Sequence, residues 1–317
     1  MNSEEADTMQ QLKEYTFGSN NGVSKIYVRS WRPEGPVKGT VQIAHGIAEY
    51  VERYDAFMQF LASAGYAVFA NDHIGHGKSA ANASDLGYVG ESNGWNAMVA
   101  DMFTVHELAA REYPDVPHFM FGHSMGSFLT RTFLITHGEV LSGAVLCGTG
   151  HQLLPVIMGG RAVTNLEIRR HGASYRSDLL NKLMFGNYND GFDEVRTPCD
   201  WLSRDPSVVD AYIADPLCGF VPTAGLVSEM LRGLNFITAK RNIDRMPKAL
   251  PVLFISGDAD PVGEDGKGVL RAYKMFLDSG MSDVQMKLYP NARHELLNEV
   301  NRAEVYDDVL SWITKHN

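Results

Sequence analysis

The sequence predicts an α/β fold, in which a mostly parallel sheet carries helices on both faces and one inserted segment interrupts the alternation. Short β-branched runs alternate with helical stretches in the first half of the chain, the alternation breaks between about residues 148 and 237, and it resumes near residue 251. The length of 317 residues suits one α/β domain with a sizeable insertion. We therefore expect two core segments, 1–152 and 234–317, around an insertion at 153–233.

The individual elements follow from the spacing of apolar residues. Asn20-Asn21-Gly22 is typical of a hairpin turn between the first two strands. Compact apolar runs predict strands at 13–17, 24–31, 40–44, 66–70, 118–121, 143–147, 251–255 and 284–289. Apolar residues three and four apart predict helices at 54–61, 95–110, 126–136, 177–184, 269–277 and 305–313.

Composition excludes several classes of protein. With 44% hydrophobic and 21% charged residues the chain is close to the globular average, which excludes disordered and fibrous classes. The net charge of -10 argues against nucleic-acid binding and weakly against anionic lipid, although a local patch could still dock there. No apolar run reaches the roughly 18 residues of a membrane span, and the acidic N-terminus lacks the pattern of a signal peptide. Three irregularly placed cysteines, Cys147, Cys199 and Cys218, favour reduced thiols in a cytoplasmic protein.

The strongest chemical motif is Gly122-His123-Ser124-Met125-Gly126, a G-x-S-x-G between a predicted strand and a predicted helix. A serine on such a tight turn needs a strained backbone to project its hydroxyl, and small flanking residues avoid collisions there. The helix that follows also favours negative charge near its N-terminus. Ser124 is therefore the candidate nucleophile.

A serine hydroxyl needs a base, and an imidazole serves best when a carboxylate fixes its tautomer. In the chain order that accompanies this turn, the acid and the histidine follow the serine. His294 lies just past the last strand, whereas His316 is the penultimate residue, so His294 is the candidate base. Asp258 and Asp260 both lie just past the preceding strand; we favour Asp260 as the acid, and the other aspartate would form a turn.

An oxyanion hole requires two backbone N–H groups. The residue after the nucleophile, Met125, supplies one of them, and the loop after the early strand at 40–44 should supply the other. His45-Gly46-Ile47 occupies that loop, which makes Ile47 the expected second donor.

Several stretches together resemble the monoacylglycerol lipase and lysophospholipase branch of the α/β-hydrolases, which is often grouped with the serine aminopeptidase S33-like hydrolases. They are similar to the family's HGxxEHxxRY and DxxGHGxS motifs, its GHSMG elbow and its paired insertion motifs, and lie at 45–54, 72–79, 122–126, 203–206 and 215–217. The resemblance implies an α/β-hydrolase fold, a triad of Ser124, Asp260 and His294, oxyanion donors at Ile47 and Met125, and an insertion that caps the site.

The resemblance also implies hydrolysis of esters with an apolar acyl chain, of the monoacylglycerol or lysophospholipid kind, without a cofactor. The chain departs from the family at Ala48, where glycine is common, and at Tyr50, where histidine is common. Both positions lie beside the oxyanion loop, so the mouth of the site and the leaving-group contacts should differ.

Apolar residues of the insertion are candidates for substrate binding. They could line an acyl tunnel, touch a membrane surface transiently, or simply pack the insertion, and they are Leu153, Leu154, Ile157, Met158 and Phe220. No sequence feature specifies an oligomeric state.

Two further clusters have alternative interpretations. Asp72, His73 and His76 lack the spacing of a metal site, and their glycine-rich context favours a structured loop. Glu49 and Arg53 stand four apart, where they either brace the oxyanion loop or form an ordinary exposed pair.

Other functions remain open on the same scaffold. A peptidase would need acids to hold a substrate amino terminus, and the insertion offers Glu167, Asp193 and Glu194. A haloperoxidase or C–C hydrolase would keep the triad, and a non-catalytic binding protein would retain only the fold.

Overall fold

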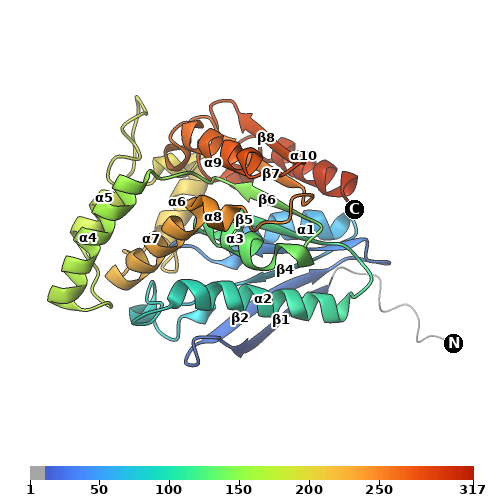
Figure 1. Cartoon of the computed structure of the whole chain (residues 1–317), viewed down its shortest axis with the longest axis horizontal. Coiled ribbons are helices and arrows are strands. Elements are labelled where there is room, and N and C mark those ends of the chain that lie inside the picture. Colours follow the sequence, from blue (N-terminus) through green and yellow to red (C-terminus); the bar gives the residue numbers. More distant parts are fainter. Residues whose placement is uncertain (1–10) are drawn as a thin grey trace.

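The computed structural model describes residues 11–317 (Figure 1), so most of the acidic N-terminal stretch lies outside the described residues. Its centre is one eight-stranded sheet in the order β1-β2-β4-β3-β5-β6-β7-β8. The strands are β1 (Gln11–Gly18), β2 (Lys25–Arg32), β3 (Gly39–Ala44), β4 (Tyr66–Asn71), β5 (His118–His123), β6 (Gly143–Cys147), β7 (Val252–Gly257) and β8 (Val284–Tyr289). The first two pairings are antiparallel and the other five are parallel. The predicted mostly parallel sheet is confirmed.

The burial of each strand explains how clearly it can be recognised in the sequence. Every residue of β3, β4, β6 and β7 is buried, as expected for parallel strands covered on both faces, and these strands appear in the sequence as continuous apolar runs. The edge strand β1 contains only exposed and half-buried residues. Its pairing with β2 closes the hairpin at Asn20-Asn21-Gly22, where Gly22 adopts a φ of 75°.

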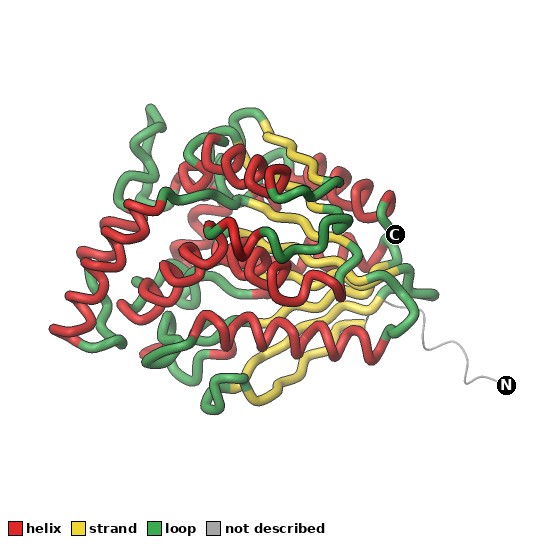
Figure 2. The backbone as a smooth tube through the Cα atoms, in the orientation of Figure 1, coloured by secondary structure: helices red, strands yellow, loops and turns green. Residues whose placement is uncertain are grey.

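Helices cover both faces of the sheet (Figure 2). Buried residues of α1 and α10 pack in one hydrophobic cluster with strand residues such as Val41 and Ile255, and those of α2, α3 and α9 pack in another with Ala44 and Phe254. Their bounds are α1 (Asp55–Ser63), α2 (Gly94–Glu112), α3 (Met125–His137), α9 (Lys267–Asp278) and α10 (Arg302–Lys315).

The segment between β6 and β7 is helical. It contains α4 (Leu154–His171), α5 (Asp178–Phe185), α6 (Pro206–Ala214), α7 (Ala224–Thr238) and α8 (Lys240–Ile243). In Figure 1, α4 and α5 lie at the edge of the molecule farthest from the labelled C-terminus. Residues 153–233, called the insertion below, end inside α7, so a division at Gly233 would cut a continuous helix.

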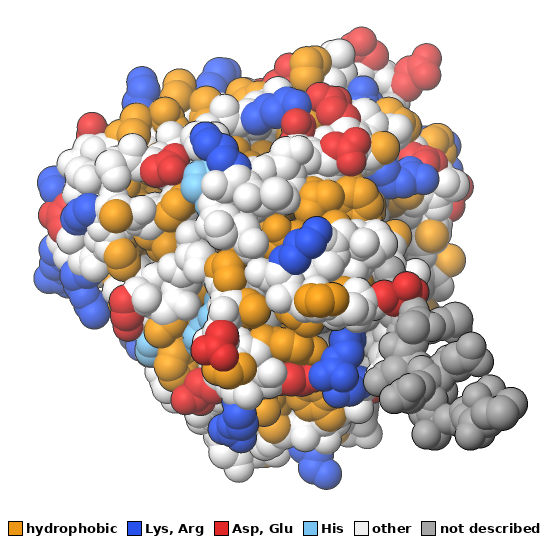
Figure 3. Space-filling model, turned by 90° about the vertical axis from the view of Figure 1, so that its right-hand side faces the viewer, with side chains coloured by type: hydrophobic (Ala, Val, Ile, Leu, Met, Phe, Trp, Pro, Cys, Tyr) orange, Lys and Arg blue, Asp and Glu red, His pale blue; other side chains and the backbone are white. Residues whose placement is uncertain are grey.

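Charges of both signs are interspersed on the face shown in Figure 3. Within residues 11–317, no helix combines the length and the apolar character needed to cross a lipid bilayer.

Candidate active site

Ser124 lies at a sharp bend between β5 and α3. Its backbone has φ 51° and ψ -121°, a conformation that non-glycine residues rarely adopt. The bend brings α3 so close to β3 that a Cβ on Gly126 would lie 2.1 Å from the carbonyl oxygen of Ala44. The Ser124 N–H donates to the Cys147 carbonyl at 3.0 Å, which fixes the bend to β6. The strained serine and the required glycine are the features expected of a nucleophile elbow.

His294 and Asp260 form a buried pair at the ends of β8 and β7. His294 Nδ1 lies 2.9 and 3.0 Å from the two carboxylate oxygens of Asp260, and the residues are 2% and 0% exposed. Burial disfavours the charged imidazole, but the attraction and hydrogen bonding of Asp260 outweigh it and raise the pKa of His294. Glu295 and Glu49 act in the same direction. The predicted acid and base are therefore brought together.

The His294 ring also lies beside the elbow. Its centroid is 4.6 Å from that of His123, the residue before Ser124. Room for both rings depends on Gly148, where an added Cβ would lie 3.0 Å from His294 Cε1 and 3.1 Å from His123 Cε1. Trp201 of the insertion packs on His294 at a centroid distance of 5.1 Å, and its carbonyl accepts from the His294 N–H. The insertion thus contacts the candidate base directly.

The loop after β3 lies against Ser124. A Cβ on Gly46 would come within 3.1 Å of Ser124 Cβ, and the Gly46 N–H donates to Glu49 Oε1 at 2.6 Å. Within residues 11–317, the N–H groups of Ile47 and Met125 have no acceptor. Unbonded N–H groups are what an oxyanion hole requires, and the role of these two amides stays a prediction.

Comparisons with known proteins identify the family of the chain. The family model described as "Serine aminopeptidase, S33" matches residues 35–301. The chain belongs to this family. It is a serine ester hydrolase with the α/β-hydrolase fold.

Relatives cover nearly the whole chain. A monoacylglycerol lipase of Mycolicibacterium smegmatis is 31% identical over 309 residues, which are 96% of this chain and 97% of that protein. A caffeoylshikimate esterase of Arabidopsis thaliana is 34% identical over 94% of this chain and 83% of its own length. The crystal structure of a thermostable carboxyl esterase from Bacillus coagulans superposes with a TM-score of 0.90 at 32% identity, and covers 97% of this chain and 99% of that one.

The departures from the family pattern have structural consequences in this hydrolase. Ala48 adopts a φ of 56°, a left-handed conformation in which glycine would be unstrained. Its carbonyl accepts from Tyr212 Oη and from the Gly219 N–H of the insertion, both at 3.0 Å. Tyr50 donates its hydroxyl to Asp215 at 2.7 Å. Both unusual positions therefore contact the insertion.

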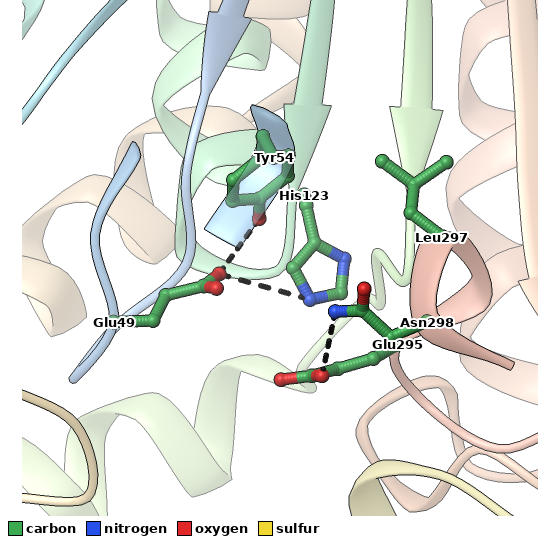
Figure 4. Close-up of a pocket in the computed structure, with 6 residues that line it drawn as sticks. All are labelled: Glu49, Tyr54, His123, Glu295, Leu297 and Asn298. Carbon is green, nitrogen blue, oxygen red and sulfur yellow. Dashed lines mark hydrogen bonds and ion pairs between the residues drawn. The ribbon is translucent and has the colours of Figure 1, made fainter. Parts of the chain in front are cut away.

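Glu49 and Arg53 form a buried ion pair of 2.7 Å, not an exposed one. Glu49 also accepts from Tyr54 Oη at 2.7 Å, and its Oε1 lies 4.0 Å from His123 Nε2 beside a small cavity (Figure 4). Sequence reasoning missed Glu295, which lines the other side of this cavity. A charged residue directly between His294 and the apolar pair Leu296-Leu297 is the signal that could have indicated a buried partner.

The histidine-rich loop after β4 is held by internal contacts. Asp72 accepts from the N–H groups of Val51 and Lys78, and its burial raises its pKa to about 7. Burial lowers the pKa of His73 to about 3 and that of His76 to about 4, so both rings are neutral near pH 7. Among residues 11–317 no group of three potential ligands is arranged to hold a metal ion.

The candidate substrate-binding residues differ in burial. Leu153, Leu154 and Met158 are each about half exposed, at 52%, 56% and 51%, whereas Ile157 is fully buried. Phe220 packs on the His76 ring at 5.3 Å. Their contact with an acyl chain stays a prediction.

Proposed function

We propose that this hydrolase cleaves carboxylic esters with an apolar acyl chain, of the monoacylglycerol or lysophospholipid kind, through an acyl-serine intermediate. The buried Asp260–His294 pair beside the strained Ser124 is the observation that carries the mechanism. The substrate class is supported by relatives named monoacylglycerol lipase and monoglyceride lipase, of which the match covers 97% and 86%.

In this mechanism His294 removes the proton from Ser124 while Oγ attacks the ester carbonyl. The N–H groups of Ile47 and Met125 stabilise the tetrahedral oxyanion, and His294 then protonates the leaving alcohol. In the second half of the reaction, His294 removes a proton from the water that attacks the acyl-serine. His294 then returns this proton to Ser124 Oγ as the carboxylic acid leaves. Asp260 holds the proton of His294 on Nδ1 and stabilises the imidazolium, and no step requires a cofactor.

The insertion serves as a cap in this proposal. Trp201 packs on His294, and Tyr212 reaches the oxyanion loop, so the insertion limits access to the reacting atoms. Its helix α4 exposes the apolar side chains Leu154, Val156 and Met158 near one end and the basic side chains Arg169 and Arg170 near the other, with the half-buried Arg161 between them. We infer that this surface makes transient contact with a lipid surface that presents the substrate, and that the protein, with its three free cysteines, is cytoplasmic.

The first experiment compares the parent chain with Ser124→Ala on p-nitrophenyl esters of rising chain length and on a monoacylglycerol. We expect turnover to rise from acetate to longer chains in the parent, and to fall in Ser124→Ala by roughly 10⁴-fold or more with the fold unchanged. Covalent labelling by a fluorophosphonate should disappear as well. Near-parental turnover in Ser124→Ala would remove this serine from the mechanism.

The family name makes an aminopeptidase the second candidate. Of the acids that might hold an amino terminus, Glu167 accepts a hydrogen bond from Ser177 at 2.6 Å, whereas Asp193 and Glu194 line an open pocket with Arg293. Hydrolysis of aminoacyl arylamides in preference to acyl esters would favour this alternative.

A further inference from the structure

Arg53 occupies a position between two buried carboxylates that come from distant parts of the chain. Its Nη1 lies 2.7 Å from Glu49 Oε2 and 2.7 Å from Glu295 Oε1, and its Nη2 lies 2.6 Å from Glu295 Oε2. The side chains are 12%, 4% and 4% exposed. One guanidinium thus binds Glu295 with two parallel hydrogen bonds and Glu49 with a third.

On one side, this ion pair reaches the oxyanion loop. The second oxygen of Glu49 accepts from the Gly46 N–H at 2.6 Å, directly before Ile47. Tyr54 Oη also donates to this oxygen at 2.7 Å, and Arg53 binds the other oxygen, so the two groups together limit rotation of the carboxylate.

On the other side, it reaches the candidate base. Glu295 directly follows His294, and its N–H donates to the Leu202 carbonyl of the insertion at 2.7 Å. Asn298 donates to the Glu295 carboxylate at 3.0 Å. The Arg53 guanidinium therefore also restrains the backbone next to His294, through its bonds to Glu295.

The insertion closes the arrangement. The guanidinium lies over the Tyr212 ring, 4.9 Å from its centroid, and Tyr212 Oη donates to the Ala48 carbonyl at 3.0 Å. Arg53 therefore contacts all three segments that surround the elbow: the oxyanion loop, the histidine loop and the insertion.

We propose that Arg53 is a positioning residue that fixes the oxyanion loop and the His294 loop relative to each other. This role rests on the proposed serine mechanism but not on the proposed substrate. It acts through Glu49 and Glu295 and does not require contact with the reacting atoms. Lysine should replace it only in part, because an ammonium group cannot bind one carboxylate with two parallel bonds while holding another.

Arg53 also sets the charge around His294. The charged and titratable groups that face the imidazole or the guanidinium are Asp260, Glu49, Glu295, His123, Tyr54, Tyr212 and Cys218. Burial penalises both glutamates; Arg53 offsets the penalty enough to lower the pKa of Glu295, while that of Glu49 stays raised. Without this cation both carboxylates lose their compensation and their pKa values rise, which changes the charge around His294.

The test compares Arg53→Met and Arg53→Lys with Arg29→Met. Arg29 is a matched control, since its side chain is 10% exposed, and it pairs with Glu14 and with Asp55 at the start of α1 without reaching Glu49 or Glu295. The readouts are kcat, KM and the pH profile of kcat/KM for p-nitrophenyl acetate, together with the temperature of unfolding.

For Arg53→Met we expect kcat to fall roughly 10- to 100-fold, because small misplacements of catalytic groups cost that much. KM should change little, and the acid limb of kcat/KM should move from its parental position, because the charge around His294 changes. For Arg53→Lys we expect a smaller loss of kcat with the acid limb near that of the parent. Arg29→Met should lower the unfolding temperature while leaving kcat and the acid limb in place.

A folded Arg53→Met enzyme with parental kcat and an unmoved acid limb would overturn the proposal, as would an equal loss in Arg29→Met. If Arg53→Met does not fold, Arg53→Lys decides, and parental kcat in that variant overturns the positioning role. A wrong substrate assignment would be recognised by a different result. A parent that hydrolyses p-nitrophenyl acetate but not a monoacylglycerol loses the substrate assignment and leaves the Arg53 comparison unaffected.

Discussion

The two aspartates after β7 show how much a single residue's environment decides. Sequence places Asp258 and Asp260 two positions apart past the same strand, so their order along the chain cannot separate them. In the structure Asp260 is fully buried against His294, whereas Asp258 is exposed and accepts from the Asn291 N–H at 2.6 Å. The preference for Asp260 agrees with this geometry, and its role stays a prediction until it is tested.

Substituting each aspartate by asparagine tests this assignment. Asp260→Asn should lower kcat by roughly 10⁴-fold, because the amide no longer holds the reactive tautomer of His294. The charge that raises the pKa of His294 is also lost, and a lower pKa leaves the imidazole neutral to lower pH. The acid limb of kcat/KM should therefore move to lower pH.

Asp258→Asn serves as the control, and it should retain kcat within a few-fold of the parent. Steady-state kinetics on a p-nitrophenyl ester between pH 5 and pH 9, taken as a range that brackets the ordinary histidine pKa of about 6.5, measure both effects. A larger loss in Asp258→Asn than in Asp260→Asn would reassign the acid.

At the scale of elements, strands were easier to predict than the helices of the insertion. Parallel strands buried on both faces give unbroken apolar runs, and all eight predicted strands are present. The insertion has no such pattern. Along α4 apolar and charged residues do not separate onto two clear faces, and only Ile157, Thr164 and Glu167 are buried, so its hydrophobic period is weak.

Because the hydrophobic period of α4 is weak, several of its apolar side chains are exposed. Whether they contact a lipid surface can be tested. Leu154 and Met158 are four residues apart and so share one face of the helix. Burying two such side chains is worth about 3 kcal/mol or more. We expect Leu154→Glu/Met158→Glu to weaken binding to neutral phosphatidylcholine vesicles by roughly 100-fold, as measured by vesicle co-sedimentation.

Turnover of p-nitrophenyl acetate should be unaffected in that variant, because this substrate reaches the site from solution. A matched control is Leu270→Glu/Leu277→Glu on α9, where the two leucines are 37% and 41% exposed. Equal vesicle binding by the parent and both variants would contradict a role for α4 at a lipid surface.

For the whole molecule, the order of elements allowed the candidate triad to be placed from the sequence. Parallel strands bring their carboxyl ends to one edge of the sheet, so residues 124, 260 and 294 could be placed together from their positions after β5, β7 and β8. The connections that hold this edge could not be predicted in the same way. Arg53 and Glu295 are 242 positions apart, and no periodicity in the sequence relates an ion pair across such a separation.

Glu299 is another such connection, since it joins the insertion to the loop that carries His294. It is fully buried and accepts from the N–H groups of Arg293, Arg204 and Val300 at 2.8, 3.1 and 3.0 Å, and from Arg204 Nε at 2.9 Å. A charged acceptor is preferred here because four donors converge on one carboxylate.

Glu299→Gln keeps the shape of the side chain but gives it one oxygen and an NH₂ group that must face donors. We expect the free energy of unfolding in urea to fall by about 2 kcal/mol, the usual value of a hydrogen bond to a charged group. Glu304→Gln is the control in the same region. Its side chain is 53% exposed and pairs with Lys287 at 2.9 Å, so its loss should be at most about 1 kcal/mol. Similar losses in the two variants would contradict the prediction that the buried Glu299 carboxylate stabilises the molecule more than an exposed ion pair does.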